Sequence, residues 1–351
     1  MKDAKTEPRL TTLSHGGGCG CKISPAVLSD ILRGTSRLPV PAELLVGLET
    51  SDDAAVYQLG PDQALVATTD FFMPIVDDPH DFGQIAATNA LSDVYAMGAR
   101  PIMALALVGM PTGQLSPETI GRILDGGAAA CRLAGIPIAG GHTIDSVEPI
   151  YGLVALGLMD PANVRRNDGA RPGDRLILGK PLGVGILSAA LKKGQLDAVG
   201  YAALIGSATR LNTVGPLLAM RGDVHAMTDV TGFGLAGHAL EMARGARVEI
   251  RLDWGTVPLL AGAADLAAGG VVTGASARNW QSYGGEVALP DGFSSADRAL
   301  LTDPQTSGGL LVAVAPGGEQ EVLDLFANEG FTAASIGEIG ERADNPVLRV
   351  S

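Results

Sequence analysis

The residues with the clearest capacity for chemistry stand near the start of the chain, in Cys19-Gly20-Cys21-Lys22, directly after three glycines. A thiolate is the reactive form of cysteine, and a nearby cation such as Lys22 lowers a thiol pKa. Glycines let such a segment swing over a site and away from it. We therefore interpret Cys19 and Lys22 as a catalytic thiol and cation on a lid. Two metal ligands of an incomplete zinc site, or a tail with incidental cysteines, are the alternatives.

A second group of candidates consists of aspartates that adjoin apolar runs. They are Asp52, Asp53, Asp70, Asp93, Asp145 and Asp229. A buried carboxylate costs free energy unless it is paired or binds a metal ion. Mg²⁺ is usually held by a few carboxylates together with phosphate oxygens of a nucleotide. Each aspartate alone could be a turn former or a helix cap, and this is the better interpretation of Asp52. As a set, they predict a magnesium–nucleotide site.

Glycine-rich segments are the third group of candidates. Backbone N–H groups in Gly140-Gly141-His142-Thr143 or Ser307-Gly308-Gly309 could bind phosphate. A tight packing turn is an equal alternative for the first segment and the favoured one for the second. The G-x-G-x-x-G pattern of Gly232–Gly237, with Asp253 about 20 residues further on, would fit a dinucleotide site. The run before it contains His225 and Asp229, whereas a buried parallel strand is apolar, so we rank this possibility low.

Composition excludes several classes of protein. A length of 351 residues corresponds to about two domains. The 25 Lys and Arg against 38 Asp and Glu give a net charge of −13, which disfavours nucleic acid as a partner. We also expect no membrane segment, because no apolar run approaches 18 residues. Three cysteines without a secretory signal indicate a cytoplasmic protein with reduced thiols.

The pattern of apolar residues predicts a two-domain α/β (α+β) chain. Residues 1–43 form a flexible glycine-rich arm with a helix over 26–33, residues 44–162 the first domain and residues 163–351 the second. In the first domain we expect strands over 54–59, 64–69, 102–108, 136–139 and 150–158, and helices over 82–97 and 117–133. In the second we expect strands near 175–179, 247–252 and 310–315, and helices near 185–192, 201–220, 236–244 and 318–328. Turn formers and charges between 159 and 174 mark the boundary.

Several of these segments resemble the signatures of the selenophosphate synthetase (selenide, water dikinase) family, in order along nearly the whole chain. They are residues 14–25 (SHGGGCGCKISP), 52–57 (DDAAVY), 68–77 (TTDFFMPIVD), 86–93 (AATNALSD), 139–145 (AGGHTID), 227–234 (MTDVTGFG) and 303–310 (DPQTSGGL). Several of them are long and rare, so the resemblance is specific. It departs from the family at Leu48, where we expect Asn, so a hydrogen bond of that loop is in doubt.

The resemblance implies an enzyme that makes selenophosphate from ATP, selenide and water and releases AMP and orthophosphate. It implies Cys19 as the catalytic thiol and Lys22 as the essential lysine. The implied magnesium ligands are Asp53, Asp93 and Asp229; the implied nucleotide contacts are Lys22, Thr50, Ser51, Asp52, Asp70 and Asp93, with Gly141, His142 and Thr143 reaching ATP from the other subunit.

The implied fold is that of aminoimidazole ribonucleotide synthetase-like proteins, with two domains of mixed sheets. The sheets of the first domain would meet across a homodimer. A monovalent cation such as K⁺ and a selenium-delivery protein are left open as a further cofactor and partner.

Three competing functions remain. The first is another ATP-using enzyme of the same superfamily, such as a thiamine-phosphate kinase or a hydrogenase maturation factor. The Cys-Gly-Cys-Lys arm argues against it. A dinucleotide oxidoreductase would depend on Gly232–Gly237. A carrier of selenium or metal would use Cys19 and Cys21 without turning over ATP.

Overall fold

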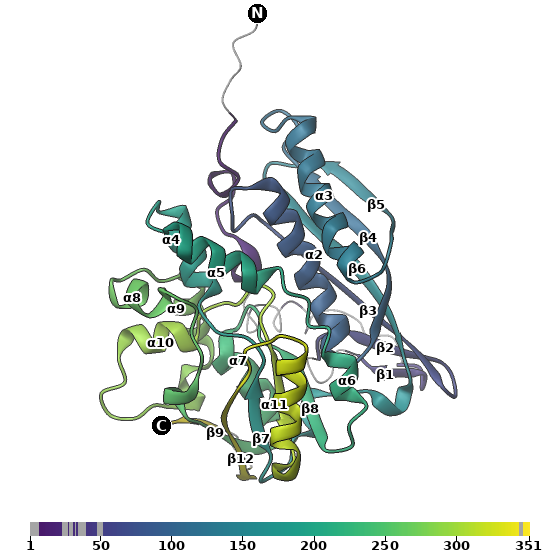
Figure 1. Ribbon diagram of the computed structural model, residues 1–351, viewed down its shortest axis with the longest axis vertical. Coiled ribbons are helices and arrows are strands. Elements are labelled where there is room, and N and C mark those ends of the chain that lie inside the picture. Colours follow the sequence, from purple (N-terminus) through teal and green to yellow (C-terminus); the bar gives the residue numbers. More distant parts are fainter. Residues whose placement is uncertain are drawn as a thin grey trace, which may run out of the picture.

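The computed structural model describes residues 7–22, 40–47, 52–343 and 347–351, together with positions 27, 31 and 33. Two sheets, each with its own helices, lie side by side, and the N-terminal segment runs between them (Figure 1). Thr50, Ser51 and Leu48, and most of the helix expected over 26–33, lie outside the described residues. Among the helices described, none has the length and apolar character needed to cross a bilayer.

The first sheet has the order β1-β2-β3-β6-β4-β5 among the described residues. Its strands are β1 (Leu44–Val46), β2 (Ala55–Gly60), β3 (Gln63–Phe72), β4 (Arg100–Met110), β5 (Ile138–Asp145) and β6 (Ile150–Met159). All neighbours are antiparallel except β4 and β5. Side chains alternate between the two faces of β3, so Thr68 and Asp70 share the buried face.

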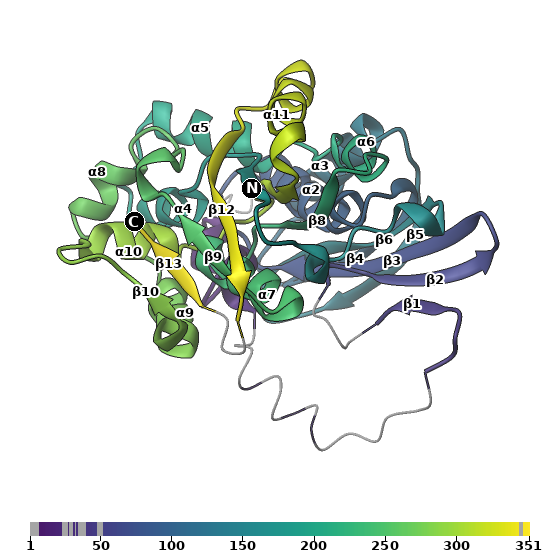
Figure 2. The same cartoon turned by 90° about the horizontal axis from the view of Figure 1, so that it is seen from below.

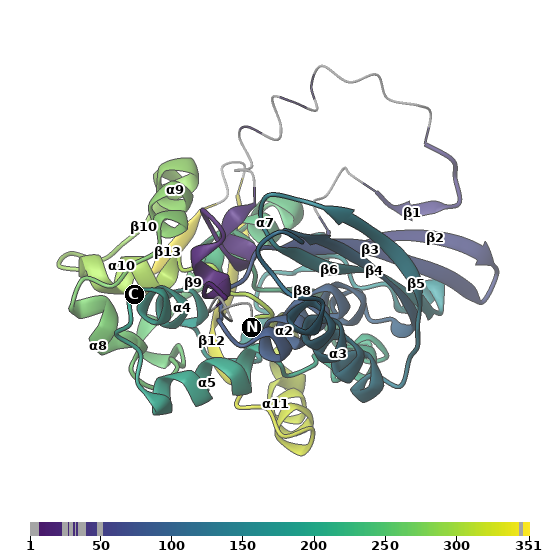
Figure 3. The same cartoon turned by 90° about the horizontal axis from the view of Figure 1, so that it is seen from above.

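One face of this sheet is covered by α2 (Pro79–Ala96) and α3 (Pro117–Leu133) (Figure 3). Asp78 caps α2 by accepting the N–H groups of His80 and Asp81, and Pro79 fits the first turn. Almost every residue of α2 after Asp81 is buried, because the second domain covers the side that the sheet and α3 leave open. The helix therefore brings side chains to the junction of the two domains.

The second sheet has the order β10-β13-β9-β12-β7-β11-β8 in the described chain. Its strands are β7 (Arg175–Leu178), β8 (Val224–Asp229), β9 (Val248–Leu252), β10 (Val287–Ala288), β11 (Leu310–Val314), β12 (Ala334–Arg342) and β13 (Leu348–Val350). The helices around it are α4 (Val184–Lys192), α5 (Ala198–Ala208), α6 (Gly215–Ala219), α7 (Gly234–Ala246), α8 (Ala263–Ala268), α9 (Gly274–Tyr283), α10 (Ser295–Leu301) and α11 (Glu319–Asn328). Strand β8 is at the edge next to the first domain and contacts α2 (Figure 2).

Most expected elements of the first domain are confirmed within a few residues, and the helix over 117–133 matches α3. The single helix expected near 201–220 is wrong, because the chain breaks between α5 and α6. The buried ammonium group of Lys180 binds the carbonyl oxygen of Arg210 at this break, which a continuous helix would have used internally. The expectations missed β8, a polar-containing edge strand, and the short helices α8 to α10.

Close packing of α2 on α3 depends on glycine. A Cβ atom at Gly126 would lie 2.0 Å from the carbonyl oxygen of His80, whereas one at Gly121, on the same helix, would meet nothing within 4 Å. Gly126→Ala should therefore destabilise the protein by about 1–3 kcal/mol through overpacking. Gly121→Ala should stabilise it by about 0.5–1 kcal/mol, because alanine favours the helix. Urea unfolding of both variants measures the difference; equal effects would contradict the packing argument.

Candidate active site

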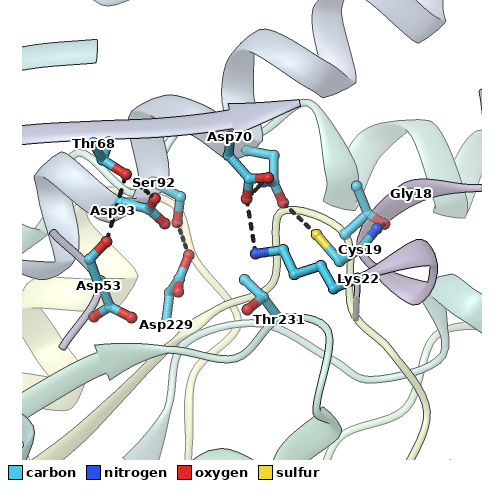
Figure 4. Close-up of polar contacts among 12 residues, drawn as sticks. Gly18, Cys19, Lys22, Asp53, Thr68, Asp70, Ser92, Asp93, Asp229 and Thr231 are labelled. Atoms are coloured by element: carbon cyan, nitrogen blue, oxygen red, sulfur yellow. Dashed lines mark hydrogen bonds and ion pairs between the residues drawn. The ribbon is translucent and has the colours of Figure 1, made fainter. Parts of the chain in front are cut away.

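Three carboxylates from distant parts of the chain meet between the domains (Figure 4). Asp53 precedes β2, Asp93 lies on α2 and Asp229 ends β8. Each accepts a hydrogen bond from a hydroxyl group, and the donors are Thr228 for Asp53 (3.0 Å), Thr68 for Asp93 (2.6 Å) and Ser92 for Asp229. The hydroxyl groups fix the orientation of the carboxylates without neutralising their charge.

Burial raises the pKa of all three carboxyl groups above the ordinary value for aspartate. The charge of Asp229 raises the pKa of Asp53 and of Asp93 further. Like charges disfavour the ionised form of each carboxyl group, so a bound cation would favour the charged carboxylates.

The cluster fits magnesium in the form that nucleotides require. Among the residues described, no three His, Cys, Asp or Glu side chains are close enough to hold one ion by themselves. Mg²⁺ commonly takes only one or two carboxylates and completes its octahedron with water and substrate phosphates. Carboxylates that are buried and oriented by hydroxyl groups, but too far apart to surround one ion, match that coordination better than an all-protein cage.

A second cluster, next to the first, contains the predicted cation and thiol. The ammonium group of Lys22 donates to Asp70 Oδ2 at 3.0 Å, and Asn89 Nδ2 donates to the same oxygen at 2.7 Å. Asn89 Oδ1 accepts the Cys19 thiol at 3.1 Å and the N–H of Ser307 at 2.7 Å. Asn89 thus connects the thiol to the Lys22–Asp70 pair. Figure 4 shows Cys19, Lys22 and Asp70 close together.

The protonation states of Lys22 and Cys19 differ from the simple expectation. Desolvation works against the charge of Lys22, but the neighbouring Asp70 raises its pKa well above the ordinary lysine value. Burial raises the pKa of Cys19 well above that of a free thiol and outweighs the effect of Lys22. Lys22 lowers the pKa of Cys19 as expected, but burial is the larger effect, so the docked Cys19 is a thiol rather than a thiolate.

The described part of the arm is docked between the two domains. Gly18, at φ +55°, leaves no room for a side chain, because a Cβ atom would lie 2.3 Å from Thr306 Oγ1. The N–H of Cys19 donates to that oxygen at 3.2 Å, and Arg278 donates to the carbonyl of Gly20 at 2.9 Å. Only glycine fits this close approach, so the docked arrangement depends on it. Release of the arm as a lid stays a prediction.

The other predicted nucleotide contacts are placed differently. Asp52 is turned toward the second domain, where it accepts the N–H of Asn167 at 2.9 Å and lies 3.9 Å from Arg166. This geometry favours a structural role for its carboxylate. Gly141, His142 and Thr143 lie on β5, an exposed edge strand that β6 and β4 separate from β3. The structure does not bring these three residues to the carboxylates of the same chain.

The glycine-rich alternatives can now be judged by their topology. Gly232–Gly237 joins β8 to α7, but the partner of β8 in the described sheet is the antiparallel strand β11, and β9, which follows α7, is four positions away from β8. A dinucleotide site of that kind is therefore wrong. Gly308 and Gly309 approach the backbone of Val230 and Lys180, so this segment is the packing turn that we favoured.

Sequence reasoning assigned no role to Asn89, Ser92 or Thr306, although all three contact the two clusters. A signal was available for the first two. Asn89, Ser92 and Asp93 have i, i+3 and i+4 spacing on one apolar helix, so they share a face. No local pattern indicated Thr306, whose contact with the arm spans 287 positions of the chain.

Comparisons with known proteins agree with this architecture. Family models for the N-terminal and C-terminal domains of AIR synthase related proteins match residues 51–159 and 171–348. The solved thiamine-monophosphate kinase from Stenotrophomonas maltophilia K279a has a TM-score of 0.65 at 22% identity, over 88% of this chain and 92% of its own. Hydrogenase maturation protein HypE, solved in complex with ATP, has a TM-score of 0.62 at 20% identity, over 98% of this chain and 94% of its own.

The fold and the domain matches thus define an AIR synthase related protein with two domains and mixed sheets. The selenide, water dikinase of Burkholderia pseudomallei (strain K96243) is 64% identical over 337 residues, which cover 96% of this chain and 95% of the relative. The chain belongs to the selenide, water dikinase family, whose members are kinase-type enzymes.

The raised carboxyl pKa values predict how stability depends on pH and magnesium. The folded protein retains protons that the unfolded chain releases above about pH 4, so the free energy of unfolding should fall as pH rises. Asp93→Asn removes one of the repelling charges. It should raise the Tm of the metal-free protein at pH 8 by about a few degrees and reduce the gain on adding Mg²⁺.

Thermal unfolding from pH 5 to 8, with and without Mg²⁺, checks this prediction. Asp125→Asn, at an exposed position on α3, is the matched control and should behave as the unmodified protein does. If Asp93→Asn kept the original pH dependence and the original response to Mg²⁺, the carboxylate cluster would not be the source of either.

Proposed function

We propose that this protein catalyses the ATP-dependent synthesis of selenophosphate from selenide and water, with release of AMP and orthophosphate. One observation carries the proposal: a cation and a thiol, Lys22 and Cys19, lie beside a set of buried carboxylates whose charge no neighbouring cation balances fully. The lysine and the thiol suit phosphoryl transfer to selenium, and the carboxylates suit the binding of a metal-bound nucleotide. The 64% identity to a relative named selenide, water dikinase supports the same reaction.

The nucleotide would bind along the cleft between the domains. Asp53, Asp93 and Asp229 are the groups that would hold Mg²⁺, which supplies neutralising charge for the phosphates when bound. The buried cluster has the charge that this task requires. The structural neighbour HypE was solved with ATP, which supports a nucleotide site in this fold. Asp52, Thr50 and Ser51 remain proposed contacts, and a requirement for K⁺ stays a prediction.

Lys22 would stabilise negative charge on the phosphoryl group that is transferred. Its ammonium group is held by Asp70, and its side chain is still 39% exposed, so it can contact a ligand in the cleft. A preorganised cation in a partly dry site is far more effective than one in water. Cys19 would orient or receive selenium, and Asn89 holds its thiol at a fixed position next to Lys22.

The open face of the first sheet supports a homodimer. Helices α2 and α3 cover one face, and none of the described helices α2 to α11 lies over the opposite face (Figure 3). Strands of this sheet expose large apolar side chains, namely Tyr57, Leu59, Phe71, Ile102 and Ile144. Such a patch is unusual on a monomer and typical of an interface. A second copy placed there would also give the exposed segment Gly141–Thr143 a route to the partner's nucleotide.

Phosphorus NMR tests the reaction directly. ATP, Mg²⁺ and the protein are mixed without oxygen, with and without selenide. We expect a selenophosphate signal only with selenide, together with equal amounts of AMP and orthophosphate. ADP alone, formed independently of selenide, would indicate a different kinase of this superfamily. No turnover would favour a carrier of selenium or metal that uses Cys19 and Cys21.

Lys22→Ala should lower turnover by about 10²–10³-fold, as expected for the loss of one preorganised charge at the reacting group. The KM for ATP should change much less, because the carboxylates and their metal carry nucleotide binding. Steady-state rates at saturating selenide measure both. Lys22→Arg, which keeps the charge beside Asp70, is the matched variant and should restore part of the rate. An unchanged turnover number in Lys22→Ala would remove the lysine from the chemistry.

A further inference from the structure

A cavity of about 280 Å³ lies on the side of the arm that faces α4 and α9. Its wall includes arm residues Gly16, Gly17 and Gly20, the end of α4 with Lys192 and Lys193, and Arg278 on α9. None of the side chains considered so far as magnesium ligands lines it. The cavity is therefore separate from the carboxylate cluster, although both border the same arm.

The charge of this cavity is opposite to that of the protein as a whole. Lys192, Lys193 and Arg278 line it, and no Asp or Glu is among the described residues of its wall. The chain as a whole has a net charge of −13. A cationic hollow in such a molecule raises the local concentration of small anions, which the rest of the surface repels.

The docked arm builds this cavity. Lys192 donates to the carbonyl oxygen of Ser14 at 3.0 Å, and Arg278 donates to that of Gly20 at 2.9 Å. Lys193 makes no side-chain hydrogen bond or ion pair within the described part of the chain, so its ammonium group is available to a ligand. Lys192 and Arg278 thus hold the arm in place, and Lys193 can bind an anion in the cavity.

Only a thin layer separates the cavity from Cys19. Thr306 lines the cavity, and its hydroxyl oxygen accepts the N–H of Cys19 at 3.2 Å. The neighbouring wall positions, Gly17 and Gly20, have no side chains to thicken the layer. The thiol itself points to the opposite side, toward Asn89 and the Lys22–Asp70 pair. An anion in the cavity is therefore one layer of backbone away from the group proposed to handle selenium.

We infer that this cavity is the site where the selenide anion binds before it reaches Cys19. The inference rests on the proposed function, which supplies selenide as the substrate. Selenide is a monoanion at neutral pH, whereas ATP with its magnesium belongs to the carboxylate side of the arm. The two substrates would approach separately, because none of the three carboxylates lines the cavity.

Kinetics of Lys193→Gln test the assignment. We expect the KM for selenide to rise about three- to fivefold, the usual effect of losing one exposed charge contact, with the KM for ATP unchanged. Lys193→Arg should restore the KM for selenide. Arg132→Gln, at an exposed position on α3, removes the same charge elsewhere and should leave both constants unchanged. An unaltered KM for selenide in Lys193→Gln, or an equal rise in Arg132→Gln, would overturn the inference.

Binding of iodide, a heavy monoanion, gives a readout that does not need turnover. Crystals soaked in iodide should show anomalous density in the cavity, and this density should weaken in Lys193→Gln. Iodide bound only at other surfaces would overturn the site. If Lys193→Gln left the KM for selenide unchanged but weakened inhibition by orthophosphate, the assignment to selenide would be overturned. The cavity would then be a binding site for the product orthophosphate. Absence of selenophosphate synthesis in the unmodified protein would refute the proposed function while iodide still reports on the cavity.

Discussion

The structure depends on one electrostatic constraint, the burial of several like charges between two domains. Asp53, Asp93 and Asp229 come from separate elements; burial raises the pKa of each, and the charge of Asp229 raises the pKa of Asp53 and of Asp93 further. Such an arrangement costs stability in the absence of cations. It persists because three hydroxyl groups orient the carboxylates and because the surrounding core is large enough to offset the cost. A bound metal ion would relieve this repulsion, so the same arrangement that lowers stability would favour the binding of a metal-bound polyanion.

Helix α2 transmits this constraint to both domains. Its interior is buried against the first sheet, α3 and the second domain, so its polar residues have no solvent to contact. They form hydrogen bonds with other parts of the protein instead. Asn89 accepts the thiol of the arm, Ser92 donates to the carboxylate at the end of β8, and Asp93 accepts a hydroxyl group of β3. The polar face of this buried helix therefore fixes the positions of the two domains and the arm relative to one another.

The arm divides the junction into two electrostatic compartments. On one side, Lys22 is paired with Asp70 beside the acidic cluster. On the other side, Lys192 and Arg278 bind the arm's carbonyl groups and border a cationic cavity. Glycines make the division possible, since a side chain at Gly17 or Gly18 would collide with Pro74 or Thr306. Under the proposed function, the nucleotide and selenide would bind on opposite sides of the arm.

The sequence by itself determined the elements with strong local signals and the identity of the chemical groups. Helix α3, with its serine cap and apolar period, and the Cys-Gly-Cys-Lys motif are examples. Only the tertiary structure decided which groups meet and in what protonation state. The pKa of Cys19 follows from burial by residues far along the chain, and neighbours in sequence do not report it. Thr306 binds the arm, and Lys193 lines the cavity, although neither is near the arm in sequence. Such placements depend on how the two sheets pack, which no local pattern encodes.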